Sequence, residues 1–259
     1  MLNRLGRLTK IKQDQSGLEV PSGQFVTEKF PVLTFGPTPK IDLATWKFSI
    51  TGLVDEEKML DWEEFNSLPK VTLDAEFHCV TQWSRLQNTW EGVLFTDMMK
   101  LANVKPEATH VMAQCYGVYS TNVALDVLMD DDVLFAQKHD GETLTSEHGG
   151  PLRLVIPKRY GWKSAKWVNG VEFMPEDMPG FWEIRGYHMN GDPWKEERFW
   201  DRLGSPVAQR SPHSIKKEAL SCERASKLER CLKKPNNKSC VTTPPSFSLR
   251  LRRAKPTAC

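Results

Sequence analysis

The apolar segments of this chain are short, and Gly, Pro, Asn and Asp residues interrupt them throughout residues 30–200. Four of these segments have the length and pattern of strands: 46–50, 71–77, 109–115 and 152–156. The dipeptides Asp140-Gly141 and Asn169-Gly170 predict tight hairpin turns. Because short strands dominate without a regular alternation of strand and helix, we expect an α+β fold with mixed sheets rather than a doubly wound sheet.

Two short helices are predicted between these strands. Asp61 is a good N-cap residue, and Glu64 follows it at the spacing of a capping box, so a helix should begin there and end before Pro69. Residues 95–102 show the apolar spacing of a second helix. The strand at 71–77 should deliver His78 and Cys79 to its C-terminal end.

The charge of the chain is unevenly distributed. Residues 205–259 contain 13 basic and 3 acidic residues, a net charge of +10, whereas residues 1–204 contain 22 basic and 30 acidic residues, a net charge of −8. The 205–259 segment has no Trp or Tyr and buries too little apolar surface to offset its chain entropy. We therefore expect a polar N-terminal arm at 1–27, a folded domain at 28–203, and a disordered, basic tail at 204–259.

No segment approaches the roughly 20 consecutive apolar residues of a membrane span. The basic N-terminus lacks the apolar core and cleavage site of a secretory signal, so the expected location is cytoplasmic. In that compartment the six cysteines are expected to be free thiols or metal ligands. The tail cysteines lie at 222, 231, 240 and 259, too far apart for the usual pairing of zinc ligands.

Cys79 is the first candidate for chemistry. It lies in the segment Phe77-His78-Cys79-Val80-Thr81-Gln82-Trp83-Ser84, at the predicted end of a strand. A thiolate there would be a soft ligand suited to a redox metal. Two alternatives remain open at this point: a buried, inert cysteine, and a nucleophile with His78, His110 or His148 as its base.

A second candidate segment runs from His148 to Trp167. Gly149, Gly150 and Pro151 precede a predicted strand that contains Arg153, and a loop with Lys163 and Lys166 follows it. Arg offers a planar fork for phosphate and Lys a point charge, so the segment suits an anion. The alternative is a solvated basic loop.

Taken in order, these segments resemble the molybdopterin-binding domain of the sulfite oxidase family over about residues 30–200. That family includes bacterial sulfite-oxidase-like proteins and the catalytic subunit of the protein-methionine-sulfoxide reductase. Three stretches carry the resemblance: Pro37-Thr38-Pro39-Lys40-Ile41-Asp42 with Trp46 and Gly52; Cys79-Val80 with Trp90, Gly92 and Val93; and 148–166. The resemblance implies a sulfite-oxidase-type α+β domain that binds a Mo-molybdopterin cofactor.

The resemblance also implies individual roles. Cys79 corresponds to the cysteine that binds molybdenum, and Tyr187 to an active-site tyrosine. The implied cofactor contacts are Thr34, Cys79, His148, Arg153, Ser164, Ala165 and Lys166.

The chain departs from the family's sulfite oxidases at positions that carry arginines in those enzymes. Leu33 replaces one of them, and Trp83 and Ser84 replace an adjacent pair. Arg85 lies one position late, and Arg185 or His188 would have to compensate. No haem domain is recognisable, so we expect electrons to pass to or from a separate electron-transfer protein or haem partner.

The sequence therefore predicts a molybdenum cofactor-dependent oxidoreductase that transfers an oxygen atom at a small, sulfoxide-, N-oxide- or sulfite-like substrate. One alternative is a non-catalytic protein that keeps the molybdopterin fold and binds a partner. Another is a nucleic-acid-binding protein driven by the basic tail. Specific nucleic-acid binding is not expected, because the acidic 1–204 segment would repel a polyanion and the tail has no Trp or Tyr for base stacking.

Overall fold

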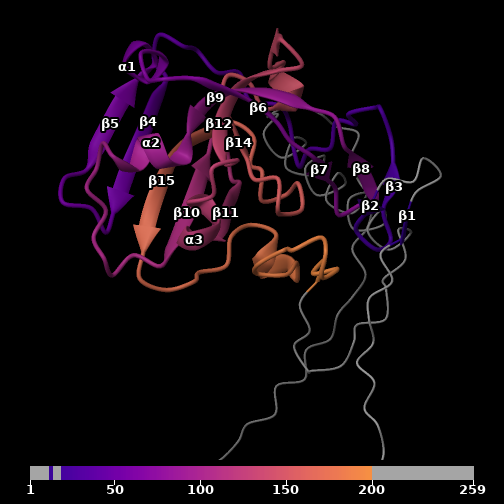
Figure 1. Ribbon diagram of the computed structural model, residues 1–259. Helices are drawn as coiled ribbons and strands as arrows, with labels where there is room; N and C mark the ends of the chain where they lie inside the picture. The colour runs from indigo at the N-terminus through magenta and orange to yellow at the C-terminus, as the bar shows by residue number, and fades with distance from the viewer. Residues whose placement is uncertain (1–11, 14–18, 200–259) are drawn as a thin grey trace, which may run out of the picture. The chain divides into compact units, whose positions relative to one another are not determined.

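The computed structural model describes residues 12–13 and 19–199, and the description below concerns these residues. A five-stranded mixed sheet forms one side of the body (Figure 1). Its strands, in spatial order, are β11 (Ser120–Ala124), β10 (His110–Cys115), β15 (Val168–Met174), β4 (Lys47–Gly52) and β5 (Lys58–Asp61). Only β15 and β4 pair in parallel within this sheet.

A second sheet packs against the first. Its strands, in spatial order, are β13 (Glu142–Thr143), β12 (Leu134–His139), β9 (Thr89–Leu94) and β6 (Val71–Asp74), and β14 (Arg153–Val155) also pairs with β12. The larger hydrophobic cluster draws on both sheets, with Phe48 and Phe173 from the first and Val93, Phe135 and Leu154 from the second. These sheets therefore share one core.

The second sheet buries its other face in a smaller hydrophobic cluster. Leu134 and Val155 lie in that cluster, whereas their chain neighbours Phe135 and Leu154 lie in the main core. Successive side chains of a strand point to opposite faces of the sheet. Neighbouring residues of β12 and β14 therefore enter different clusters, because both faces of this sheet are buried. Cys79 belongs to the smaller cluster.

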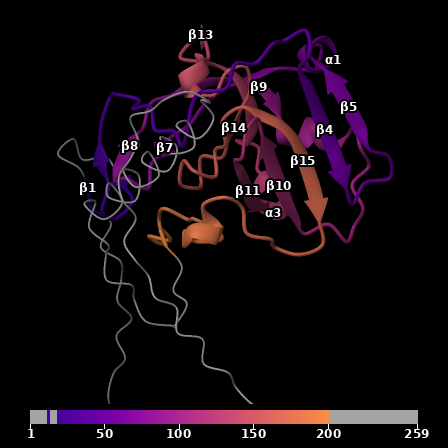
Figure 2. The ribbon, with the colours of Figure 1, turned by 180° about the vertical axis from the view of Figure 1, so that it is seen from behind.

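A further sheet of three very short strands lies beside the larger sheets (Figure 2). They are β3 (Phe25–Val26), β8 (Trp83–Arg85) and β7 (Phe77–His78). β3 runs parallel to β8, and Thr27 N donates to Ser84 O at 2.9 Å. A separate strand pair, β1 (Lys12–Gln13) and β2 (Glu19–Val20), precedes it, and Val20 is buried. Residues 19–27, expected as part of a polar arm, thus pair and pack with the body.

The helices are short, as expected. They are α1 (Trp62–Asn66), α2 (Phe95–Met99), α3 (Leu125–Leu128) and the 3-10 turns η1 (Ser146–His148) and η2 (Glu183–Arg185). Both hydrogen bonds of the predicted capping box form at α1: Glu64 N donates to Asp61 Oδ1 at 2.9 Å, and Asp61 N to Glu64 Oε2 at 2.8 Å. No helix within the described residues has the length and apolarity to span a bilayer.

Two local predictions were wrong. The predicted strand 71–77 is two strands, because the chain leaves β6 at Asp74 and enters the small sheet at Phe77. Asn169-Gly170 is no turn but lies inside β15, where Gly170 pairs with Ser49. A Cβ on Gly170 would lie 2.2 Å from Ser49 Oγ, so glycine there permits close strand packing. The expected features of 204–259 lie outside the described residues.

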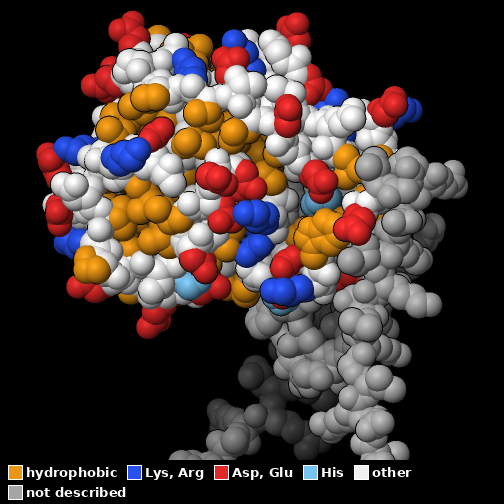
Figure 3. All heavy atoms as spheres, in the orientation of Figure 1, with side chains coloured by type: hydrophobic (Ala, Val, Ile, Leu, Met, Phe, Trp, Pro, Cys, Tyr) orange, Lys and Arg blue, Asp and Glu red, His pale blue; other side chains and the backbone are white. Residues whose placement is uncertain are grey.

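The surface of the body carries charges of both signs. The face in Figure 3 shows acidic and basic side chains interspersed with hydrophobic patches. Large exposed apolar side chains on the described residues include Met59, Val118, Met178, Ile184 and Trp194.

Candidate active site

Cys79 lies in a tight loop at the end of β7, as the sequence predicts. Cys79 N donates to Trp83 O at 2.8 Å and Gln82 N donates back to Cys79 O at 3.0 Å, with Gln82 in the left-handed region. Two distant residues clamp this loop. Gln24 Nε2 donates to Cys79 O at 3.1 Å, and Arg198 NH1 donates to Val80 O at 2.6 Å.

Burial raises the pKa of the Cys79 thiol, while the Thr81 hydroxyl, at 3.1 Å from Sγ, and the charges of Arg153 and Arg198 oppose that shift. A thiol in this setting is held neutral until a cation favours its thiolate. The structure offers no histidine base: among the described residues, no histidine is hydrogen-bonded to Sγ. The His78 ring instead bonds Ser84 Oγ at 2.8 Å and lies 3.1 Å from Glu76 Oε2.

Arg153 projects from β14 into the smaller cluster that holds Cys79. Its neighbours Leu152 and Leu154 face the main core, so strand alternation directs Arg153 to the opposite side. The side chain is 4% exposed, and the guanidinium lies over the rings of Phe30, Phe77 and Trp90. Burial lowers the pKa of Arg153 to about 10, and the charge of Cys79 opposes that shift.

The hydrogen bonding of Arg153 is incomplete. NH1 donates to His148 O at 3.0 Å, but Nε is buried and has no partner among the described residues. A buried charged donor without an acceptor is costly. An anionic ligand would satisfy it, and this is the observation by which the site fits an anionic cofactor.

Lys166 and His148 lie near Arg153, and Thr34 is bonded to Lys166. Lys166 Nζ donates to Thr34 Oγ1 and to Glu147 O, each at 2.6 Å. Burial and the charge of Arg153 lower the pKa of Lys166 to about 7. The His148 ring stacks on Phe30 at 4.7 Å, and burial, Arg153 and Lys166 lower its pKa. Mutual repulsion among these cationic groups is relieved by a bound anion.

Ser164 and Ala165 lie in the loop after β14 and bond this loop back to the strand. Ile156 N donates to Ser164 Oγ at 3.0 Å, and Leu154 N donates to Ala165 O at 2.9 Å. Both residues are buried. Their hydrogen bonds place the backbone of 164–166 beside Arg153, and the Ser164 hydroxyl serves as an acceptor within the fold.

Tyr187 lies in an aromatic cluster after η2. Its ring contacts those of Trp162, Trp182 and Phe199 at centroid distances of 5.1, 4.9 and 5.1 Å. These contacts place Tyr187 beside Trp162, which directly precedes Lys163 and the 164–166 loop.

The cations named as replacements for the missing arginines are bonded to other groups. Arg85 donates to Asp140 and Asn88, Arg185 donates to Phe181 O, and His188 Nδ1 lies 3.3 Å from Glu197. Sequence reasoning missed Arg198, whose charge acts on Cys79. It lies in the run Lys195-Glu196-Glu197-Arg198, which is typical of a solvated surface and gave no signal.

The chain is similar in sequence to known oxidoreductases. Residues 35–182 match the family described as an oxidoreductase molybdopterin binding domain. The chain is 46% identical over 192 residues to the uncharacterized oxidoreductase YuiH of Bacillus subtilis, covering 73% of this chain and 96% of YuiH. It is 29% identical to the protein-methionine-sulfoxide reductase catalytic subunit MsrP of Gluconobacter oxydans, over 67% of this chain and 61% of MsrP. It is 28% identical to sulfite oxidase of Arabidopsis thaliana, over 60% of this chain and 48% of that protein.

Proposed function

Because this chain belongs to the family of oxidoreductases with a molybdopterin-binding domain, we propose that Cys79 binds the molybdenum of a Mo-molybdopterin cofactor and that Tyr187 faces the substrate. The protein is a molybdopterin-dependent oxidoreductase. The observation that carries the site assignment is the buried Arg153 guanidinium, whose Nε has no partner among the described residues and which packs on the cluster that holds the buried Cys79 thiol.

The cofactor, when bound, supplies two-electron oxygen-atom transfer. Cys79 would contribute a soft thiolate as the protein ligand of the metal. Arg153, Lys166, His148 and Thr34 would hold the anionic part of the cofactor, with the backbone of 164–166 alongside. The Tyr187 hydroxyl would donate a hydrogen bond to the substrate oxygen and so stabilise the negative charge that develops on this atom.

We further propose a neutral substrate such as a sulfoxide or N-oxide. Sulfite is largely dianionic and needs cations around the metal. Leu33 is exposed, Trp83 and Ser84 are buried, and Arg85, Arg185 and His188 are bound to other groups. Loss of two charged contacts would lower kcat/KM for sulfite by roughly a thousandfold if the effects add.

A separate electron-transfer protein is the proposed partner, since two relatives are named as reductase subunits. The proposed location stays the cytoplasm, and both cysteines of the described residues are free thiols.

Metal analysis of protein from a cofactor-producing host tests the assignment directly. The wild type should carry about one molybdenum per chain, and Cys79→Ser should lose metal-dependent turnover because a hydroxyl is a hard, rarely ionised ligand. Cys115→Ser is the matched control, since Cys115 is also a buried thiol but lies in the main core. Wild-type activity in Cys79→Ser would refute the assignment.

Steady-state kinetics with methionine sulfoxide and with sulfite, using artificial electron donors and acceptors, test the substrate class. We expect turnover of the sulfoxide and poor turnover of sulfite. Efficient sulfite oxidation that disappears in Arg198→Ala would overturn the neutral-substrate proposal and identify Arg198 as the replacing cation.

A further inference from the structure

A buried ion pair joins two segments that carry candidate site residues. Lys163 Nζ lies 2.6 Å from Glu183 Oε1, and both side chains are fully buried. Lys163 directly precedes the 164–166 loop, and Glu183 lies four residues before Tyr187. Withdrawing two charges from water is costly, and apolar residues of similar volume often stabilise a fold as well or better. A contribution to stability alone therefore does not explain the pair.

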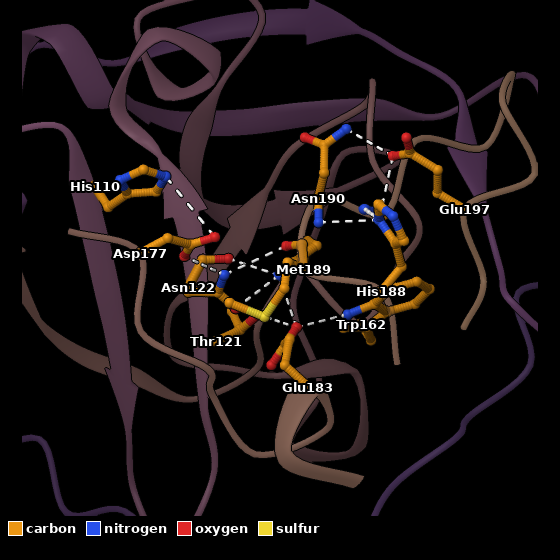
Figure 4. Close-up of polar contacts among 12 residues, drawn as sticks. His110, Thr121, Asn122, Trp162, Asp177, Glu183, His188, Met189, Asn190 and Glu197 are labelled. Atoms are coloured by element: carbon orange, nitrogen blue, oxygen red, sulfur yellow. Dashed lines mark hydrogen bonds and ion pairs between the residues drawn. The ribbon is translucent and has the colours of Figure 1, made fainter. Parts of the chain in front are cut away.

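Further hydrogen bonds hold both members of the pair. Lys163 Nζ also donates to Asn122 O at 2.7 Å and to Asn122 Oδ1 at 2.9 Å, so all three ammonium protons have acceptors. Glu183 Oε1 further accepts from Trp162 Nε1 at 2.9 Å and from Thr121 Oγ1 at 3.3 Å. Figure 4 shows Thr121, Trp162 and Glu183 converging beside Asn122. The network thus connects β11, the 162–166 loop and η2.

Trp162 links the ion-pair network to Tyr187 by a direct ring contact. Its indole packs edge-on against the Tyr187 ring, with an interplanar angle of 82°. The Tyr119 hydroxyl donates to Trp162 O, and a Cβ on Gly191 would lie only 2.8 Å from the indole. Trp162 is therefore held at its indole Nε1 and at its backbone carbonyl, and Gly191 packs against the six-membered ring of the indole.

We propose that the Lys163–Glu183 pair is a positioning device that fixes the Trp162 indole and, through it, the orientation of Tyr187 relative to the 164–166 loop. This rests on the proposed function, since it takes Tyr187 and the 164–166 loop to face one cofactor. Lys163 and Glu183 are positioning residues, because their contacts are with the fold. Disturbing them should lower kcat more than it changes KM, since ground-state binding does not need the oriented hydroxyl.

Four variants of the holoenzyme separate positioning from folding. Glu183→Gln and Lys163→Met each leave one buried charge uncompensated and should lower Tm by about 10 °C. The double variant Lys163→Met/Glu183→Leu should recover most of that loss, but kcat should stay roughly 10- to 100-fold low, because the Trp162 anchor is gone. The control Lys158→Met breaks an exposed pair with Asp130 in the same loop and should leave Tm and kcat unchanged. Wild-type kcat in the double variant would overturn the proposal.

A double-mutant cycle tests whether the pair acts through Tyr187. In a Tyr187→Phe background, Glu183→Gln should change kcat by less than about twofold, because the oriented group is already absent. If Glu183→Gln lowers kcat by the same factor in the Tyr187→Phe background as in the wild type, the proposal is overturned.

Hydrogen exchange gives a readout that needs no turnover. Glu183→Gln should speed amide exchange in 160–167 and 181–188 together, while β4 and β5 stay protected. Unchanged exchange in those segments would overturn the positioning role. Absence of molybdenum from the wild type would instead refute the proposed function, and the exchange measurement would still test the ion pair.

Discussion

Arg153 is a cation in an almost wholly aromatic setting, and its burial leaves the guanidinium only one acceptor among the described residues, His148 O. A charge-assisted contact to a buried anion is worth about 1.5–3 kcal/mol. Arg153→Ala should therefore lower cofactor occupancy roughly tenfold or more at limiting cofactor. Metal and pterin content per chain provide the measurement. Arg159→Ala is the control, since the Arg159 guanidinium donates to Lys158 O in an exposed setting; equal occupancy in the two variants would contradict the anchoring role.

Lys166 makes cofactor affinity depend on pH. Its pKa of about 7 in the free protein should rise when an anion binds, because the anion favours the ammonium. Below pH 7 Lys166 is already charged, and its contribution to binding is complete. Above pH 7 binding must take up a proton, so affinity should fall by up to about tenfold per pH unit. Cofactor binding titrated from pH 6 to 9 measures this, and Lys166→Met should flatten the profile. An unchanged slope in that variant would assign the dependence to another group.

The site could be predicted only in part at this scale. Sequence motifs pointed to Thr34, His148, Arg153 and Lys166, and the structure brings these four together, although their roles stay predictions. The pairing of Lys163 with Glu183 gave no signal, because a lysine in a basic loop and a glutamate near a surface turn suggest solvent exposure. Only the fold shows that both are buried.

At the scale of the strand, Gly92 sets the spacing of the second sheet. A Cβ there would lie 2.0 Å from Phe135 O and 2.7 Å from Ala136 Cα, both backbone atoms of β12. Gly92→Ala should therefore destabilise the protein by about 1–3 kcal/mol or more, because β9 and β12 must separate. Gly117→Ala is the control: space is open there, and only its positive φ adds strain of about 1 kcal/mol. Urea unfolding compares them, and a smaller loss at Gly92 would contradict the close-approach argument.

Elements whose signals are local were predictable, and those set by distant partners were not. The α1 capping box depends on residues three apart, and both of its hydrogen bonds form. Asn169-Gly170 has a turn sequence, yet Gly170 pairs in parallel with Ser49 of β4, 121 residues earlier in the chain, and this pairing makes the dipeptide part of a strand. The predicted strand 71–77 likewise divides into β6 and β7, because β6 pairs with β9 in the second sheet and β7 pairs with β8 in the small sheet.

At the scale of the molecule, the boundaries at 28 and 204 stay predictions. The family match covers 35–182, and β3, at Phe25–Val26, pairs with β8 of the body. We propose that the catalytic body includes 19–27, since Gln24 holds the Cys79 loop.

Deletion of 205–259 tests the other boundary. That segment has no Trp or Tyr, so we expect cofactor content to stay unchanged and Tm to shift by less than about 3 °C. Deletion of 1–18 is the companion variant at the other end. A loss of several degrees on removing 205–259 would show that the segment contributes to the body.

The clamps on the Cys79 loop also bear on how the protein matures. Gln24 and Arg198 reach this loop across 55 and 118 residues of chain, respectively. Contacts of such long sequence separation form late in folding, and Arg198 leaves the ribosome long after Cys79. A nascent chain that exposes Cys79 therefore lacks the finished loop, and the metal loading that we propose at Cys79 belongs to the completed polypeptide.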